Sequence, residues 1–90
     1  MIQVRISGPL KEVCRGDSDV QINEEESLRD VLKHLDNLYP GIWSTLVRNQ
    51  MLRRFVNVYV NGINVRGLDG LATPLNANSV VDLHVAVSGG

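Results

Sequence analysis

Residues 55–65 read Phe-Val-Asn-Val-Tyr-Val-Asn-Gly-Ile-Asn-Val and carry the strongest β signal in the chain. β-branched and aromatic side chains dominate 55–60, which favours a strand. The pair Asn61-Gly62 is typical of a two-residue hairpin turn, because both of its positions need a positive φ. We therefore predict a strand at 55–60, a tight turn, and a short returning strand at 63–65.

The N-terminal residues predict a second hairpin. Apolar and polar side chains alternate over 1–6 and again over 19–23, so each segment is expected to be a strand with one apolar face. The pair Gly8-Pro9 breaks the first pattern, and residues 10–17 are polar enough to predict a loop. The two strands are expected to pair antiparallel across this connection.

A helix is predicted next. Ser27 can cap its first turn, with Asp30 at the third helical position, and the acidic run at 24–26 suits the positive end of the helix dipole. Residues 39–41, Tyr-Pro-Gly, are expected to end it. The apolar residues that recur at helical spacing form one stripe: Leu28, Val31, Leu32, Leu35 and Leu38.

The remaining segments predict short elements. Residues 42–47 are expected to form a second, short helix. The three arginines of the polar stretch 48–54 suit either an acidic partner or a solvated loop, and the solvated loop is the preferred interpretation. A turn or a single helical turn is predicted within 68–75, and a further turn at 76–79 leads into a last strand at 81–87.

This order of elements predicts an α+β fold in one domain, residues 1–90. A helix after the first hairpin suits a right-handed crossover, which places later strands beside the first strand in one sheet. One face of that sheet is expected to pack on the helical stripe, while the other face stays open.

Composition argues against several classes of protein. Nine basic and ten acidic residues give a net charge of −1, without the basic stripe of a nucleic-acid-binding module. No apolar run approaches the roughly 20 residues that span a bilayer. The N-terminus does not resemble a signal peptide, so we expect a cytoplasmic protein. The single cysteine, Cys14, forms no intrachain disulfide and is interpreted as an inert thiol.

The sequence shows no catalytic motif of its own. His34 and His84 lack the spacing of metal ligands, and no Ser-His-Asp order or nucleophile elbow is present. Residues 67–70 lack the lysine of a phosphate-binding loop. We therefore expect no metal site, no cofactor bound by the chain itself, and no enzymatic activity.

The end of the sequence carries the expected chemistry. The last strand runs into residues 88–90, Ser-Gly-Gly, and a main-chain carboxylate at Gly90 is ionised at neutral pH. Such a carboxylate attacks the α-phosphate of ATP when another protein binds both. Glycine has no Cβ, so this backbone fits a narrow channel. The residues expected to insert into the partner are Ala86, Val87, Ser88 and Gly89.

Four motifs resemble a known family. Residues 55–62, the pair Val65-Arg66, residues 68–75 and the ending 86–90 look like the ThiS/MoaD sulfur-carrier proteins. The arm inserted at 41–54 is similar to that of MoaD-like carriers related to CysO. The resemblance implies a ubiquitin-like β-grasp fold, with a mixed sheet packed on one main helix and a flexible C-terminal tail at 86–90.

The resemblance also implies a mechanism. An E1-like adenylyltransferase/sulfurtransferase would use ATP to adenylate Gly90 and convert it to a thiocarboxylate, whose sulfur passes to a biosynthetic enzyme. A metalloprotease that trims the tail is a further implied partner. Leu68 and His84 match docking positions on the open sheet face of relatives. Taken alone, Leu68 can equally be a core residue of its turn, and His84 a plain surface residue.

Three alternative functions remain open at this stage. The same adenylate can end as an isopeptide with a lysine, which would make the chain a ubiquitin-like protein modifier. The chain can also be the small subunit of molybdopterin synthase, where carrier and structural roles merge. An interaction domain with incidental glycines is the third. The sulfur acceptor (a cysteine, thio-metabolite or cofactor pathway) is not specified by the residues.

Overall fold

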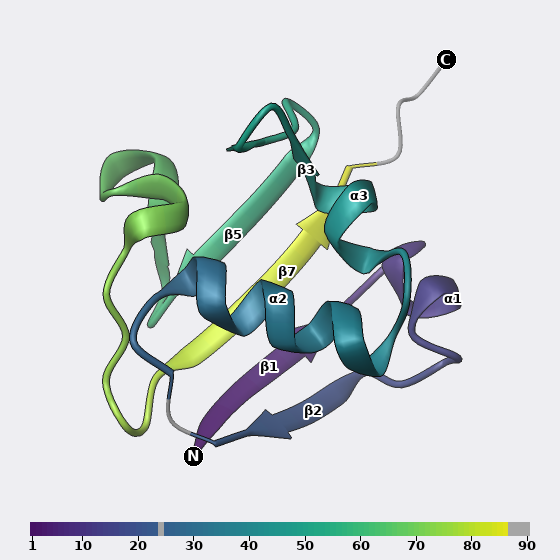
Figure 1. The fold of residues 1–90 in the computed structure, drawn as a ribbon, viewed down its shortest axis with the longest axis horizontal. Helices are drawn as coiled ribbons and strands as arrows, with labels where there is room; N and C mark the ends of the chain where they lie inside the picture. Colours follow the sequence, from purple (N-terminus) through teal and green to yellow (C-terminus); the bar gives the residue numbers. More distant parts are fainter. Residues whose placement is uncertain (24, 87–90) are drawn as a thin grey trace.

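The computed structural model describes residues 1–23 and 25–86, which form a five-stranded mixed sheet with helices on one face (Figure 1). The strands of this sheet are β1 (Ile2–Ile6), β2 (Asp19–Ile22), β5 (Val56–Val60), β6 (Ile63–Asn64) and β7 (Val80–Val85). The helices are α1 (Leu10–Val13), α2 (Leu28–Leu38) and α3 (Ile42–Leu46), with 3-10 turns η1 (Val65–Gly67) and η2 (Gly70–Ala72).

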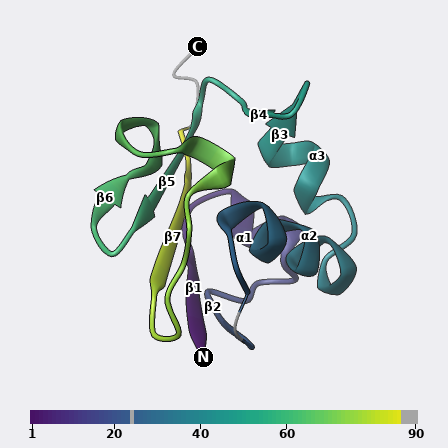
Figure 2. The same cartoon turned by 60° about the vertical axis from the view of Figure 1, so that its left-hand side comes forward.

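The strand order is β2-β1-β7-β5-β6, so the last strand lies at the centre of the sheet. β7 pairs parallel with β1 and antiparallel with β5, and the two predicted hairpins, β1–β2 and β5–β6, are both antiparallel. The predicted return of the chain beside the first strand is confirmed, because α2 follows the first hairpin and the later strand β7 pairs parallel with β1. Figure 2 shows α2 and α3 on one side of the sheet.

The core lies between the sheet and α2. On β1 the three residues of the predicted apolar face, Ile2, Val4 and Ile6, are all buried. Four residues of the helical stripe, from Leu28 to Leu35, are fully buried as well. Leu38 is the exception, with 40% of its surface exposed. The chain turns after Leu38 and places Tyr39 and Ile42 in the core, so the prediction for Leu38 was wrong.

The predicted ends of α2 are confirmed. The Ser27 side chain accepts a 3.3 Å hydrogen bond from the Asp30 backbone N–H and thereby satisfies one of the free donors of the first turn. The helix ends at Leu38, with Tyr39 as its C-cap, and Gly41 follows with φ 102°. The Asn61-Gly62 turn also has the expected positive φ values, 51° and 85°.

Two predicted loops contain regular structure. Residues 10–17 include α1, because Leu10 and Cys14, four residues apart, are both buried and give this polar segment one apolar side. Residues 48–54 include part of a small hairpin of β3 (Val47–Arg48) and β4 (Met51–Leu52). Its turn residues, Asn49 and Gln50, both have positive φ, as a tight hairpin requires.

Candidate functional site

The candidate site is built around β7, the strand that leads to the tail. Val81 and Leu83 point into the core and are fully buried, whereas Asp82 and His84 lie on the open face. The strand is held on both sides by β1 and β5. Beyond its last residue, the Ala86 N–H donates a 2.9 Å hydrogen bond to the Phe55 carbonyl. The base of the tail is therefore fixed to the sheet as far as Ala86.

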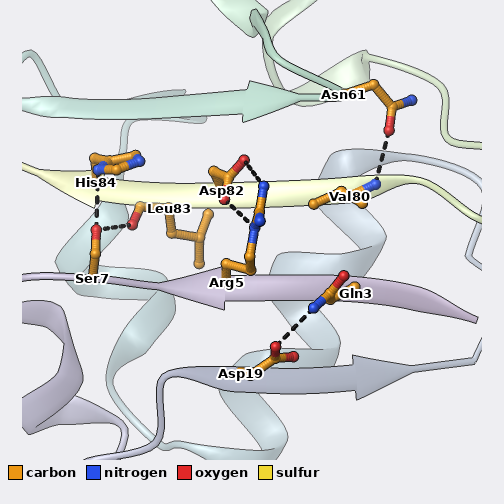
Figure 3. Close-up of polar contacts among 9 residues, drawn as sticks. All are labelled: Gln3, Arg5, Ser7, Asp19, Asn61, Val80, Asp82, Leu83 and His84. Atoms are coloured by element: carbon orange, nitrogen blue, oxygen red, sulfur yellow. Dashed lines mark hydrogen bonds and ion pairs between the residues drawn. The ribbon is translucent and has the colours of Figure 1, made fainter.

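The open face of the sheet is polar and its side chains pair across neighbouring strands (Figure 3). Arg5 of β1 forms two hydrogen bonds with the Asp82 carboxylate, at 2.7 and 3.1 Å, and this carboxylate raises the pKa of the guanidinium. Gln3 donates to Asp19 at 2.7 Å. These contacts leave the open face polar and hydrogen-bonded, which suits recognition by a partner with polar groups of its own.

His84 lies near the end of β7, two residues before Ala86. Its Nδ1 is 3.0 Å from the Ser7 hydroxyl, which is also 3.2 Å from the Leu83 carbonyl oxygen (Figure 3). The Tyr59 ring meets the imidazole edge-on at a centroid distance of 5.6 Å. The imidazole is thereby positioned by two neighbouring strands while its surface stays exposed.

Leu68 is the second predicted docking residue. It follows η1 and is 43% exposed, so it is not a core residue of its turn. β5 separates β7, which carries His84, from β6, which leads to Leu68. The roles of Leu68 and His84 in docking therefore stay predictions.

Of the predicted tail, the structure describes only Ala86, whose side chain is exposed. Val87, Ser88, Gly89 and Gly90 lie outside the described residues, so the predicted reactive carboxylate has no structural account here.

The described residues offer little other chemistry. They contain no group of three or more His, Cys, Asp or Glu side chains that could hold a metal ion. Cys14 is buried, and burial raises the pKa of its thiol, which keeps the sulfur protonated and unreactive at neutral pH. No helix of the described chain is both long and apolar enough to cross a bilayer.

Sequence reasoning missed the residues that surround His84. Ser7 follows the first strand, and its contact with His84 joins positions 77 residues apart. The alternation of residues 1–6 indicates that Arg5 faces away from the core, but not which strand lies beside it. No local signal could have paired Ser7 or Arg5 with β7.

Comparison with known proteins gives a family match over nearly the whole chain. The model of the ThiS family matches residues 4–90. Small archaeal modifier protein 3 of Haloferax volcanii is 30% identical over 91 aligned positions, which cover 99% of this chain and 98% of that protein. The sulfur carrier protein CysO of Mycobacterium tuberculosis is 38% identical over 68 positions, which cover 72% and 73% of the two chains.

Solved structures agree with the family match. The complex of BexX and CysO from Amycolatopsis orientalis contains a chain that superposes with a TM-score of 0.91 at 28% identity, covering 100% of both chains. The crystal structure of Mycobacterium tuberculosis CysO superposes with a TM-score of 0.86 at 32% identity, covering 97% of this chain and 100% of that one. These similarities confirm the predicted β-grasp fold.

Proposed function

The chain belongs to the ThiS family of ubiquitin-like carriers and modifiers, and we propose that it is a sulfur carrier that transports sulfur on Gly90. The observation that carries the proposal is the family match, which continues through residues 86–90 and so includes the Gly89-Gly90 pair. The chain acts in this scheme as the substrate of partner enzymes and not as a catalyst.

The proposed chemistry begins at the Gly90 carboxylate. One carboxylate oxygen attacks the α-phosphate of ATP on an E1-like enzyme, which releases pyrophosphate and leaves an acyl-adenylate. Hydrosulfide from the sulfur source of that enzyme then attacks the acyl carbon, and AMP leaves with the electron pair of the broken carbon–oxygen bond. The product is a thiocarboxylate, in which one oxygen of Gly90 is replaced by sulfur.

The geometry of β7 supports delivery of such a group. The buried Val81 and Leu83 anchor β7 in the middle of the sheet. The hydrogen bond between Ala86 and Phe55 fixes the backbone one residue beyond the end of the strand. The four residues after Ala86 reach at most about 14 Å when extended. A partner that binds the open face beside His84 would therefore receive Gly90 within about 14 Å of Ala86.

The partners we propose are an E1-like activating enzyme and an enzyme that accepts the sulfur, both in the cytoplasm. A complex of CysO with BexX supports the idea that a carrier of this fold binds a second protein stably enough to crystallise. We propose Leu68 and His84 as contact residues for such partners. A metalloprotease that trims the tail stays a prediction.

Intact-mass analysis tests the proposal. The chain, isolated from its native host or incubated with that host's E1-like enzyme, ATP and a sulfide source, should gain the mass difference between sulfur and oxygen. A variant without Gly90 should fold normally, as judged by circular dichroism, and gain nothing. If the unmodified mass persists with an enzyme that thiolates another carrier of the host, the proposal is wrong.

A second candidate function is protein modification. The 30% identity with a small archaeal modifier protein, over nearly the full length of both chains, favours it specifically. Here a lysine amine displaces AMP from the same adenylate and an isopeptide results. Peptides from the native host that carry residues of this tail on a lysine would establish it, and their absence from cells that express the chain would exclude it.

A further inference from the structure

The charges of this protein are segregated along the chain. Residues 41–68 contain four arginines and no Asp or Glu, although the whole chain has a net charge of −1. Within the described residues, none of these four arginines forms an ion pair with a carboxylate. A surface rich in arginine that its own chain does not neutralise attracts an acidic partner.

A groove of about 500 Å³ is lined by residues 50–52 and Arg66 of this segment, together with Arg29 and residues 69–72. Arg29, from the first turn of α2, and Arg66, from η1, contribute the positive charge, and Asp69 contributes one negative charge. The apolar part of its lining comes from the β3–β4 hairpin of the arm (residues 41–54) and from η2. These apolar residues are Met51, Leu52, Leu71 and Ala72.

Arg66 contributes to the shape of the groove as well as to its positive charge. Its guanidinium donates hydrogen bonds to the backbone carbonyls of Arg53, Arg54 and Val56, which ties η1 to the end of the arm and to the start of β5. Met51, in contrast, is 70% exposed at the groove edge. An exposed thioether on a flexible side chain adapts its shape to an incoming apolar group.

The groove lies close to the base of the tail along the chain. Met51 precedes Phe55 by four residues, at most about 14 Å of extended backbone, and the Phe55 carbonyl accepts the hydrogen bond from Ala86. The arm and the C-terminal end of β7 lie at the same end of the sheet (Figures 1 and 2). A protein that binds the tail would therefore also contact the arm.

We propose that this groove binds an acidic peptide segment of a partner protein, with an apolar side chain of that segment placed against Met51 and Leu71. The proposal rests on the proposed function only in identifying the partner as an enzyme that receives the tail. A peptide is favoured over a nucleic acid because the apolar lining gains nothing from a phosphate backbone. Single-stranded nucleic acids also need aromatic platforms, and the groove lining contains no aromatic side chain.

Peptide selection tests the proposal without ATP or Gly90. A phage-displayed library of random short peptides is selected on the full chain and counter-selected on the Arg29→Glu variant. We expect the enriched sequences to combine Asp or Glu with Leu, Phe or Met. A synthetic peptide of the enriched sequence should shift the backbone amide signals of residues 50–52 and 70–72. Deletion of Gly90 should leave this binding unchanged, so the peptide assay and the thiocarboxylate assay fail independently.

Four variants measure the contribution of charge and of apolar contact. Arg29→Glu and Met51→Glu should each weaken binding of the synthetic peptide by about tenfold. Lys11→Glu on α1 makes the same charge change as Arg29→Glu but outside the groove, and Leu38→Glu matches Met51→Glu on the last turn of α2. Both controls should bind within about twofold of the unmodified chain, because residues outside a contact contribute little.

Several results would overturn the proposal. Enriched peptides that are neutral or basic would contradict the charge argument, and a failure to enrich any peptide would show that the groove does not bind peptides. Amide shifts outside residues 50–52 and 70–72 would place the contact elsewhere. Stronger shifts of the same amides by an oligothymidylate would identify a nucleic-acid site instead.

Discussion

The two faces of the central sheet differ although the same strands build both. On β7, Val81 and Leu83 face the helix and are fully buried, while Asp82 and His84 alternate with them on the open face. The helix side is apolar, and the open side is joined by polar pairs such as Arg5–Asp82. Stability is therefore expected to depend on the helix side of β7, and the proposed partner binding on its open side, so each can be tested separately.

Truncation of a buried side chain on the helix side of the sheet should have the largest effect on the free energy of unfolding. Leu83→Ala removes a fully buried side chain from the centre of the core and leaves a cavity, which should lower the free energy of unfolding by about 2–5 kcal/mol. Urea denaturation measures this loss. A loss below about 0.5 kcal/mol, the range of ordinary surface substitutions, would mean that the two faces do not differ as described.

The Tyr39 hydroxyl, at the C-terminal end of α2, should make an intermediate contribution to the free energy of unfolding, and this contribution should depend on pH. Its hydroxyl donates a 2.6 Å hydrogen bond to the Asp17 carboxylate, and this bond, with burial, raises the tyrosine pKa to about 12. The folded state therefore holds the phenolic proton more tightly than the unfolded state. The stabilisation that the folded state gains from this raised pKa is fully present below the ordinary tyrosine pKa of about 10. It is lost as the pH rises from there toward 12.

Two variants check the behaviour of Tyr39. The chain contains two tyrosines, so in Tyr59→Phe the tyrosinate absorbance reports Tyr39 alone and should rise with a midpoint near 12. Tyr39→Phe should lose about 1.5–3 kcal/mol at neutral pH, the usual net contribution of a hydrogen bond to a charged group. The stability of this variant should fall less between pH 10 and 12. An ordinary midpoint in Tyr59→Phe would refute the effect of Asp17.

The open face should show the smallest effect on stability. His84→Ala removes an exposed side chain and should change the free energy of unfolding by less than about 0.5 kcal/mol. If His84 is a docking residue, the same change should lower the rate of thiocarboxylate formation by about fivefold or more. Gln21→Ala, an exposed substitution on the edge strand β2, is the matched control. Equal rates in both variants would make His84 a plain surface residue.

Much of the fold could be predicted because its signals are local. The cap at Ser27, the Asn61-Gly62 turn and the alternation of β1 each depend on residues within a few positions of one another. The prediction failed where burial decided the outcome. Residues 10–17 look polar, yet Leu10 and Cys14 reach the core and a short helix forms around them. Leu38 matches the helical stripe, yet the chain turns and buries Tyr39 in the core, while Leu38 stays exposed.

The sequence by itself determined the main strands and the main helix, although not α1 or the β3–β4 hairpin, and it identified the Gly89-Gly90 ending as the expected reactive group. Those properties follow from side-chain periodicity and backbone preference over a few residues. Only the tertiary structure decided that Ser7 lies against His84, that β7 lies between β1 and β5, and that the arm and η2 enclose a groove beside Arg29. These contacts join residues far apart along the chain, and packing of the whole core places them together.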